Sequence, residues 1–118
     1  MRSVLSAAAV LTALCLTLAA ADTKPPTVNI YSQTPVEFGV KNTLICHTSG
    51  FHPPRIDIML KKNGKPLEDC SDSDLSFGRD WTYYKTKHVE FTPESGDNWE
   101  CEVKHDEGKP LTYRLEIF

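Results

Sequence analysis

Short stretches in which apolar and polar residues alternate constrain the fold of this chain more than any other feature. Seven of them occur after residue 21, and turn-forming Pro, Gly, Asp and Asn residues separate them. They span residues 28–31, 43–48, 56–60, 75–77, 88–91, 99–104 and 111–117, and an aromatic run at 81–84 precedes the fifth. A period of two is typical of half-buried β-strands, and helical periodicity is missing. The pattern predicts an all-β antiparallel sandwich or barrel.

The first 21 residues differ from the rest and predict a secretory signal peptide. Arg2 supplies a positive charge, residues 4–18 are uncharged and mostly apolar, and small Ala residues follow at 19–21. We expect cleavage after Ala20 or Ala21. A retained membrane anchor is the alternative, but about 15 apolar residues are few for a bilayer-spanning helix. We therefore expect a signal peptide at 1–21, one domain at 22–118, and a secreted chain that does not insert into the membrane.

Three cysteines remain after the signal peptide, and they allow three pairings. Cys46 and Cys101 lie inside alternating stretches, whereas Cys70 lies in a polar, acidic run. Cysteines on strands of facing sheets can meet with the fixed geometry of a disulfide, which a cysteine in a loop seldom does. We therefore predict one inter-sheet bridge, Cys46–Cys101. Closing a loop of this length stabilises a fold by roughly 4 kcal/mol on the chain-entropy model.

The charge of the mature chain disfavours a nucleic-acid partner. Removal of residues 1–21 leaves 12 basic and 16 acidic residues and changes the formal net charge from −3 to −4. Both signs are scattered along the chain, whereas nucleic-acid binding needs clustered Lys and Arg.

Several sequence motifs resemble immunoglobulin constant-type domains. WECEVKH at 99–105 is similar to their aromatic-x-Cys-x-Val-x-His motif, and Cys46, SGFHP at 49–53 and the 55-residue cysteine spacing agree with it. Further matches at 63–64, 73–77, 80–81 and 90–93 resemble the beta-2-microglobulin family, the light subunits of class I histocompatibility (MHC class I) molecules. The resemblance covers about residues 26–117. It implies a seven-stranded antiparallel immunoglobulin C1-type sandwich.

The chain also departs from the constant-type pattern at a few positions. Leu60 stands where most constant-type domains have a Trp, a peculiarity that the beta-2-microglobulin family shares. Trp99 replaces the usual corner Tyr, and an indole can donate a hydrogen bond but not accept one. Cys70 is an addition to the pattern, and His47 stands where an aromatic residue is more usual.

Strand alternation predicts a surface rich in aromatic residues. If Cys46 points inward, Ile45 and His47 point outward, and Tyr31 and Tyr84 share their face of the sheet. Phe77 and Trp81 flank the loop at its end. Large aromatic residues on a solvated face are typical of a partner-binding surface, although Phe77, Trp81 and Tyr84 could instead fill the core.

The resemblance implies that this surface binds a class I heavy chain non-covalently and so supports antigen presentation. The predicted partner-binding residues are Tyr31, Gln33, His47, His52, Asp74, Phe77, Asp80, Trp81 and Tyr84. A free constant-type domain of another receptor, or another secreted immunoglobulin-like binder, is the alternative.

Catalytic, metal-binding and cofactor-binding residues are not predicted. The four histidines lack metal-ligand spacing, and Asp72 and Asp74 fit a solvated loop better than a catalytic carboxylate pair. Acidic neighbours should raise the pKa of the Cys70 thiol, which disfavours a nucleophile. A small secreted enzyme that uses Cys70 or the histidines is therefore the weaker alternative, and we expect no cofactor.

Overall fold

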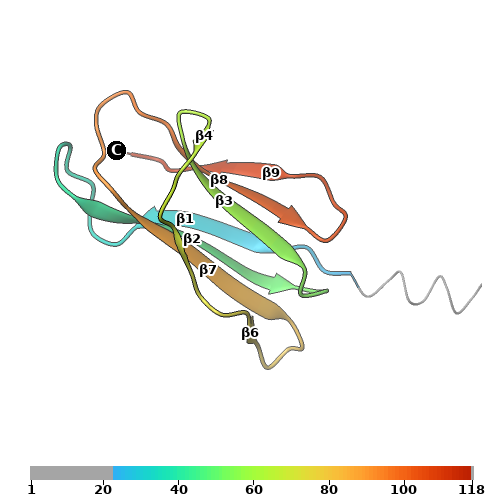
Figure 1. Cartoon of the computed structure of the whole chain (residues 1–118). Coiled ribbons are helices and arrows are strands. Elements are labelled where there is room, and N and C mark those ends of the chain that lie inside the picture. The colour runs from blue at the N-terminus through green and yellow to red at the C-terminus, as the bar shows by residue number, and fades with distance from the viewer. Residues whose placement is uncertain (1–22, 118) are drawn as a thin grey trace, which may run out of the picture.

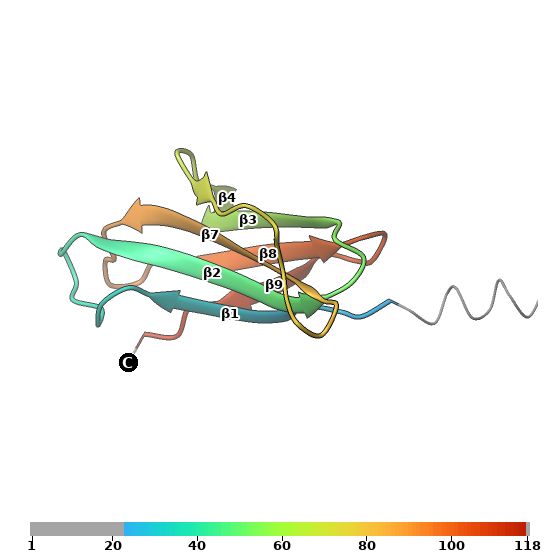
Figure 2. The ribbon, with the colours of Figure 1, turned by 90° about the horizontal axis from the view of Figure 1, so that it is seen from below.

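Two antiparallel β-sheets pack face to face in the computed structural model, which describes residues 23–117. The predicted signal peptide, residues 1–21, lies outside the described residues. The strands are β1 (Thr27–Ser32), β2 (Asn42–Phe51), β3 (Ile56–Lys62), β4 (Lys65–Pro66), β5 (Ser71–Asp72), β6 (Ser76–Phe77), β7 (Tyr83–Phe91), β8 (Trp99–His105) and β9 (Leu111–Arg114). One sheet has the order β1-β2-β7-β5, with β6 also paired to β7, and the other has the order β4-β3-β8-β9 (Figure 1, Figure 2). The predicted sandwich is confirmed.

Strand boundaries differ from the sequence prediction in the middle of the chain. Tyr83 and Tyr84, the second half of the aromatic run at 81–84, belong to the same strand as the stretch at 88–91, because β7 is continuous from Tyr83 to Phe91. Lys85 and Lys87 hide this continuity, since they occupy positions on the inward side of the strand. The Lys87 side chain is only 21% exposed, and its Nζ donates to the carbonyl of Ile58 at 3.0 Å. Its alkyl stem thus lies along the edge of the sandwich while its charge finds polar partners.

Other differences concern the sheet edges. The strand predicted at 75–77 is shorter, since only Ser76–Phe77 (β6) pairs with β7, and a separate fragment that was not predicted, β5 at Ser71–Asp72, also pairs with β7. β9 ends at Arg114, so the prediction of a strand to residue 117 was too long. β5, β6 and β9 lie at sheet edges, where fewer ladder hydrogen bonds hold the backbone in register.

The core joins the inward residues of both sheets. Cys46 from β2 and Cys101 from β8 form the predicted disulfide, with a Cα–Cα distance of 6.3 Å and no exposed surface. Leu60, in the position where a Trp is more common, is 1% exposed and pairs in register with Cys101. Trp99 packs edge to face on Phe91, with ring centroids 4.8 Å apart. The indole Nε1 of Trp99 is buried without a hydrogen-bond partner among residues 23–117, so the corner hydrogen bond of a Tyr is lost here.

Within residues 23–117, no helix has the length and apolar character that crossing a membrane requires.

Removal of the disulfide tests how much stability it supplies. The double variant Cys46→Ala/Cys101→Ala should lose roughly 4 kcal/mol of unfolding free energy, because the unfolded chain regains the entropy that the cross-link removes. Urea denaturation followed by tryptophan fluorescence measures the change. Cys70→Ser is the matched control, because Cys70 is not in the bridge. A double variant within 1 kcal/mol of the parent would contradict the expectation.

Candidate partner-binding surface

The outer side of the sheet formed by β1, β2 and β7, here called the β1–β2–β7 face, carries three rows without acidic or basic residues apart from histidine. Register pairing defines the rows, which are Thr27–Ser49–Tyr84–Ser76, Asn29–His47–Thr86 and Tyr31–Ile45–His88–Ser71. Tyr31 and Tyr84 are 44% and 43% exposed. The alternation predicted for β1, β2 and β7 is therefore found.

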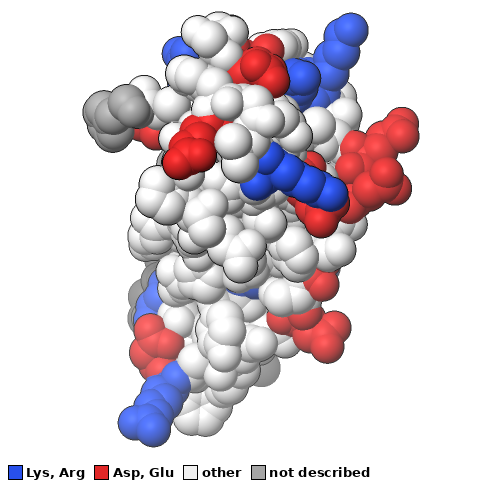
Figure 3. Space-filling model, turned by 90° about the vertical axis from the view of Figure 1, so that its left-hand side faces the viewer, with Lys and Arg blue, Asp and Glu red and all other residues white. Residues whose placement is uncertain are grey.

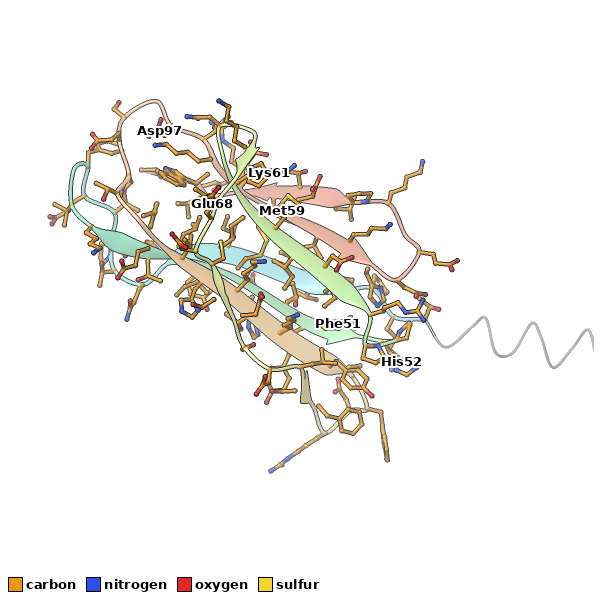
Figure 4. All side chains as sticks on the ribbon, viewed as in Figure 1. Phe51, His52, Met59, Lys61, Glu68 and Asp97 are labelled. Atoms are coloured by element: carbon orange, nitrogen blue, oxygen red, sulfur yellow. A yellow bond between two sulfur atoms is a disulfide. The ribbon has the colours of Figure 1, made fainter. Side chains whose placement is uncertain are left out.

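The outer side of the other sheet is charged and internally neutralised. Asp57 on β3 pairs in register with Lys104 on β8, and Lys61 pairs with Glu100. Lys61 Nζ also lies 3.2 Å from Glu102 Oε2. Met59 is the exposed apolar residue in the middle of this side, where it projects from β3 beside Lys61 (Figure 4). Such a mixed, paired surface is well suited to water, so the two outer sides of the sandwich differ in chemistry.

The loop between β6 and β7 presents Phe77 and Trp81 at one end of the β1–β2–β7 face. Trp81 is 76% exposed and Phe77 is 51% exposed. The alternative that Phe77, Trp81 and Tyr84 fill the core is therefore wrong. The Phe77 and Trp81 rings meet edge to face with centroids 5.5 Å apart. An aromatic pair at this distance on the outside of a small domain is a large apolar projection.

Local hydrogen bonds hold the loop in its shape. The backbone N–H of Gly78 donates to the carbonyl of Thr82 at 2.7 Å and closes the turn. The Thr82 hydroxyl donates to Asp80 Oδ1 at 2.5 Å, and the Thr82 N–H donates to the same oxygen at 3.3 Å. Trp81, between these residues, has a φ of +65°. Bulky side chains rarely adopt positive φ, so the bonds from its neighbours maintain a costly backbone conformation.

Asp80 is an electrostatic part of the same loop. The hydrogen bond from the Thr82 hydroxyl, assisted by backbone N–H groups and by the charge of Lys24, holds the pKa of the Asp80 carboxyl below its ordinary value, although partial desolvation opposes the shift. A hydrogen bond to the ionised form favours that form. Asp80 therefore stays charged and keeps its acceptor role at neutral pH.

Tyr83 is a member of the aromatic group that sequence reasoning missed. Its ring lies 5.0 Å from that of Phe77 and 6.2 Å, nearly parallel, from that of His52. Phe51 and His52 lie at the end of β2, at the same end of the sandwich as the loop (Figure 4). The alternation of β7 could have predicted the inward position of Tyr83, because its neighbour Tyr84 points outward. Tyr83 thus connects the exposed Phe77 to the half-buried His52.

The remaining predicted residues complete a stripe rather than a single cluster. Gln33 follows β1 and is exposed, so it lies beyond Tyr31 at the far end from Trp81. His47 lies in the middle, with its Nδ1 2.7 Å from the Thr86 hydroxyl and its ring 6.3 Å from that of Tyr84. Asp74 is exposed near β6. His52 Nδ1 is buried without a hydrogen-bond partner among residues 23–117, so it has unused hydrogen-bonding capacity.

Cys70 and the acidic residues form no other site among the residues described. Cys70 is half-buried, its thiol donates to the carbonyl of Leu67 at 3.5 Å, and burial raises its pKa. The predicted direction of the shift is right, but burial contributes more than the carboxylates of Asp72 and Asp69, and Lys87 opposes them. Residues 23–117 contain no group of three or more potential ligands that could hold a metal ion. Acidic and basic side chains are interspersed on the end of the molecule in Figure 3.

Comparison with known proteins agrees with the observed fold and identifies the family of the chain. The family model described as the immunoglobulin C1-set domain matches residues 28–108. The chain is thus an immunoglobulin domain of the C1 set. It is 43% identical over 108 residues to beta-2-microglobulin of Xenopus laevis, which covers 92% of this chain and 94% of the relative. It is 50% identical over 94 residues to beta-2-microglobulin of Oryctolagus cuniculus, covering 79% of this chain and 95% of the relative. The chain belongs to the beta-2-microglobulin family.

The Asp80 hydrogen bonds predict a pH dependence of the loop. Because the folded-state pKa of Asp80 is lowered, its contribution to stability is present above the ordinary carboxyl pKa and disappears as pH falls through the lowered value. A carbon-13 NMR titration should therefore place the Asp80 midpoint below the usual value near 3.9. In Thr82→Val, which removes the hydroxyl, the midpoint should move back toward that value. An unchanged midpoint in this variant would contradict the assigned cause.

Proposed function

We propose that this chain is the light subunit of MHC class I molecules, which binds and stabilises the heavy chain for peptide antigen presentation. The observation that carries the proposal is the contrast between the two outer sides of the sandwich. The β1–β2–β7 face carries tyrosines and, apart from histidine, no acidic or basic residue in its three rows, whereas the other side is charged and internally paired. A surface of the first kind favours burial against another polypeptide. Membership of the beta-2-microglobulin family supports the same conclusion.

The heavy chain covers the stripe from Gln33 to Trp81 in this proposal. Tyr31, His47 and Tyr84 pack on the heavy chain's own immunoglobulin-like domain, and Phe77 and Trp81 insert under its peptide-binding platform. Trp and Tyr are common hot-spot residues because they bury a large area with few rotatable bonds. The preformed turn around Trp81 reduces the ordering that binding would otherwise require.

Stabilisation of the heavy chain follows from mass action. A subunit that binds the folded heavy chain, but not the unfolded one, shifts the folding equilibrium toward the folded state. Such a role requires only an interface and no reacting group. Binding rather than catalysis is therefore the activity that we assign to the chain, with no cofactor and no nucleic-acid partner.

Secretion is part of the proposal, because the heavy chain's extracellular portion is the partner. We propose that residues 1–21 are a cleaved signal peptide and that the mature chain reaches the cell surface through the heavy chain. Expression of the full chain in animal cells, followed by mass spectrometry of the secreted product, should show an N-terminus at Ala21 or Asp22. A product that retains residues 1–21 would contradict the cleavage.

Removal of the Trp81 side chain tests the interface directly. Trp81→Ala should weaken heavy-chain binding by about 2 kcal/mol or more, the cost typical of a hot-spot residue. Surface plasmon resonance with an immobilised class I heavy-chain ectodomain measures the change. Met59→Ala is the matched control, because Met59 is an exposed apolar residue on the opposite, charge-paired side. Equal affinity of Trp81→Ala and the parent chain would remove Trp81 from the interface.

A further inference from the structure

His47 occupies the centre of the β1–β2–β7 face. It lies in the middle row, between Asn29 on β1 and Thr86 on β7. The neighbouring rows place Tyr31, Ile45 and His88 on one flank and Ser49 and Tyr84 on the other. The proposed heavy-chain contact therefore includes an imidazole at its middle rather than at its rim.

Few charged groups face His47 from the elements around it. Its register partners on β1 and β7 are an amide and a hydroxyl, and Tyr84 is the nearest aromatic ring. Asp80, from the loop between β6 and β7, lines the same shallow hollow as His47 and Tyr84 and is the one carboxylate there. The Lys41–Glu90 ion pair lies at the far end of the face, where both side chains are at least 70% exposed. A charge on His47 would thus be added to an almost uncharged surface.

The hydrogen bond to Thr86 fits either charge state of the free chain. A hydroxyl can donate to Nδ1 of a neutral imidazole or accept from the Nδ1–H of a charged one. In the free chain, water can solvate the added charge. In a complex the charge would be desolvated against the partner, which is costly unless the partner supplies a carboxylate. Imidazole is the side chain that ordinarily changes charge between about pH 5 and 8.

We propose that protonation of His47 weakens heavy-chain binding, so that the complex loosens on mild acidification. The inference rests on the proposed function of the same face and adds its regulation. Dissociation exposes the imidazole, which then takes up a proton from solution. By linkage, a group that binds a proton more readily in the free chain reduces affinity as the pH falls.

His88 does not share this role, although it lies on the same face. Glu68, Asp69 and Glu90 line the hollow that includes His88. Glu68 lies on the segment that leads to β5 (Figure 4). His88 thus has three carboxylates of its own chain around it where His47 has one, and His88→Gln is the matched control for His47→Gln. Glutamine keeps a hydrogen-bonding group at both positions but cannot take up a proton.

Affinity measurements at two pH values test the proposal. Circular dichroism first verifies that the parent chain, His47→Gln and His88→Gln are folded at about pH 7.5 and pH 5.5. The affinity of each chain for a class I heavy-chain ectodomain is then measured at both pH values. The parent chain and His88→Gln should lose about tenfold in affinity at the lower pH, the effect of one pK unit of linkage. His47→Gln should change less than threefold.

Calorimetry in buffers of different ionisation enthalpy gives an independent readout. Binding near pH 6.5 should release protons from the parent chain and release fewer from His47→Gln. The same pH dependence and proton release in His47→Gln as in the parent would overturn the role of His47 and leave the proposed function intact. Failure of all three chains to bind at pH 7.5 would overturn both.

Discussion

The bridge between Cys46 and Cys101 determines the facing of the residues around it. Its sulfur atoms must lie between the sheets, so the neighbours of Cys46 along β2, Ile45 and His47, must lie outside. Cross-strand pairing transmits this choice to β1 and β7, because residues in register share a side of the sheet. A shift of one residue in β2 would bury His47 and expose Leu44. The chemistry of the β1–β2–β7 face thus follows from the position of one covalent bond.

The outer faces of the two sheets carry side chains of different chemistry. On β3 and β8, opposite charges stand across from each other, as in Asp57 and Lys104, and the surface is complete without a partner. In the three rows on β1, β2 and β7 the corresponding positions are aromatic, aliphatic, amide, hydroxyl or imidazole groups. Such groups neither repel a neighbouring chain nor require one charge sign in it. The first surface favours contact with water and the second favours contact with protein, which gives a small domain a single preferred side for assembly.

Sequence reasoning succeeded where side chains alternate cleanly and failed where an edge changes the pattern. The disulfide, the facing of β2 and the exposure of Trp81 follow from alternation and from the composition of the neighbouring residues. Alternation gave the outward facing of Tyr84 but not the start of β7 at Tyr83, because inward-facing Lys85 and Lys87 look like solvated residues until Ile58 and Asp72 are found beside the Lys87 ammonium. These contacts join segments about 30 and 15 residues apart in the chain, and local pattern does not encode them.

The loop around Trp81 shows why the shape of the site could not be derived from its composition. Alternation and turn residues identify a loop, but they do not specify a φ of +65° at a tryptophan. That conformation costs on the order of 1–3 kcal/mol and persists only where the surroundings determine it. Asp80 and Thr82 supply the determining bonds, and a Cβ on Gly78 would lie only 3.0 Å from Asp80 Oδ1 and 3.3 Å from the Thr82 carbonyl. Gly78 therefore lets the carboxylate close on Thr82, and the closed turn keeps the indole in solvent, where a partner can reach it.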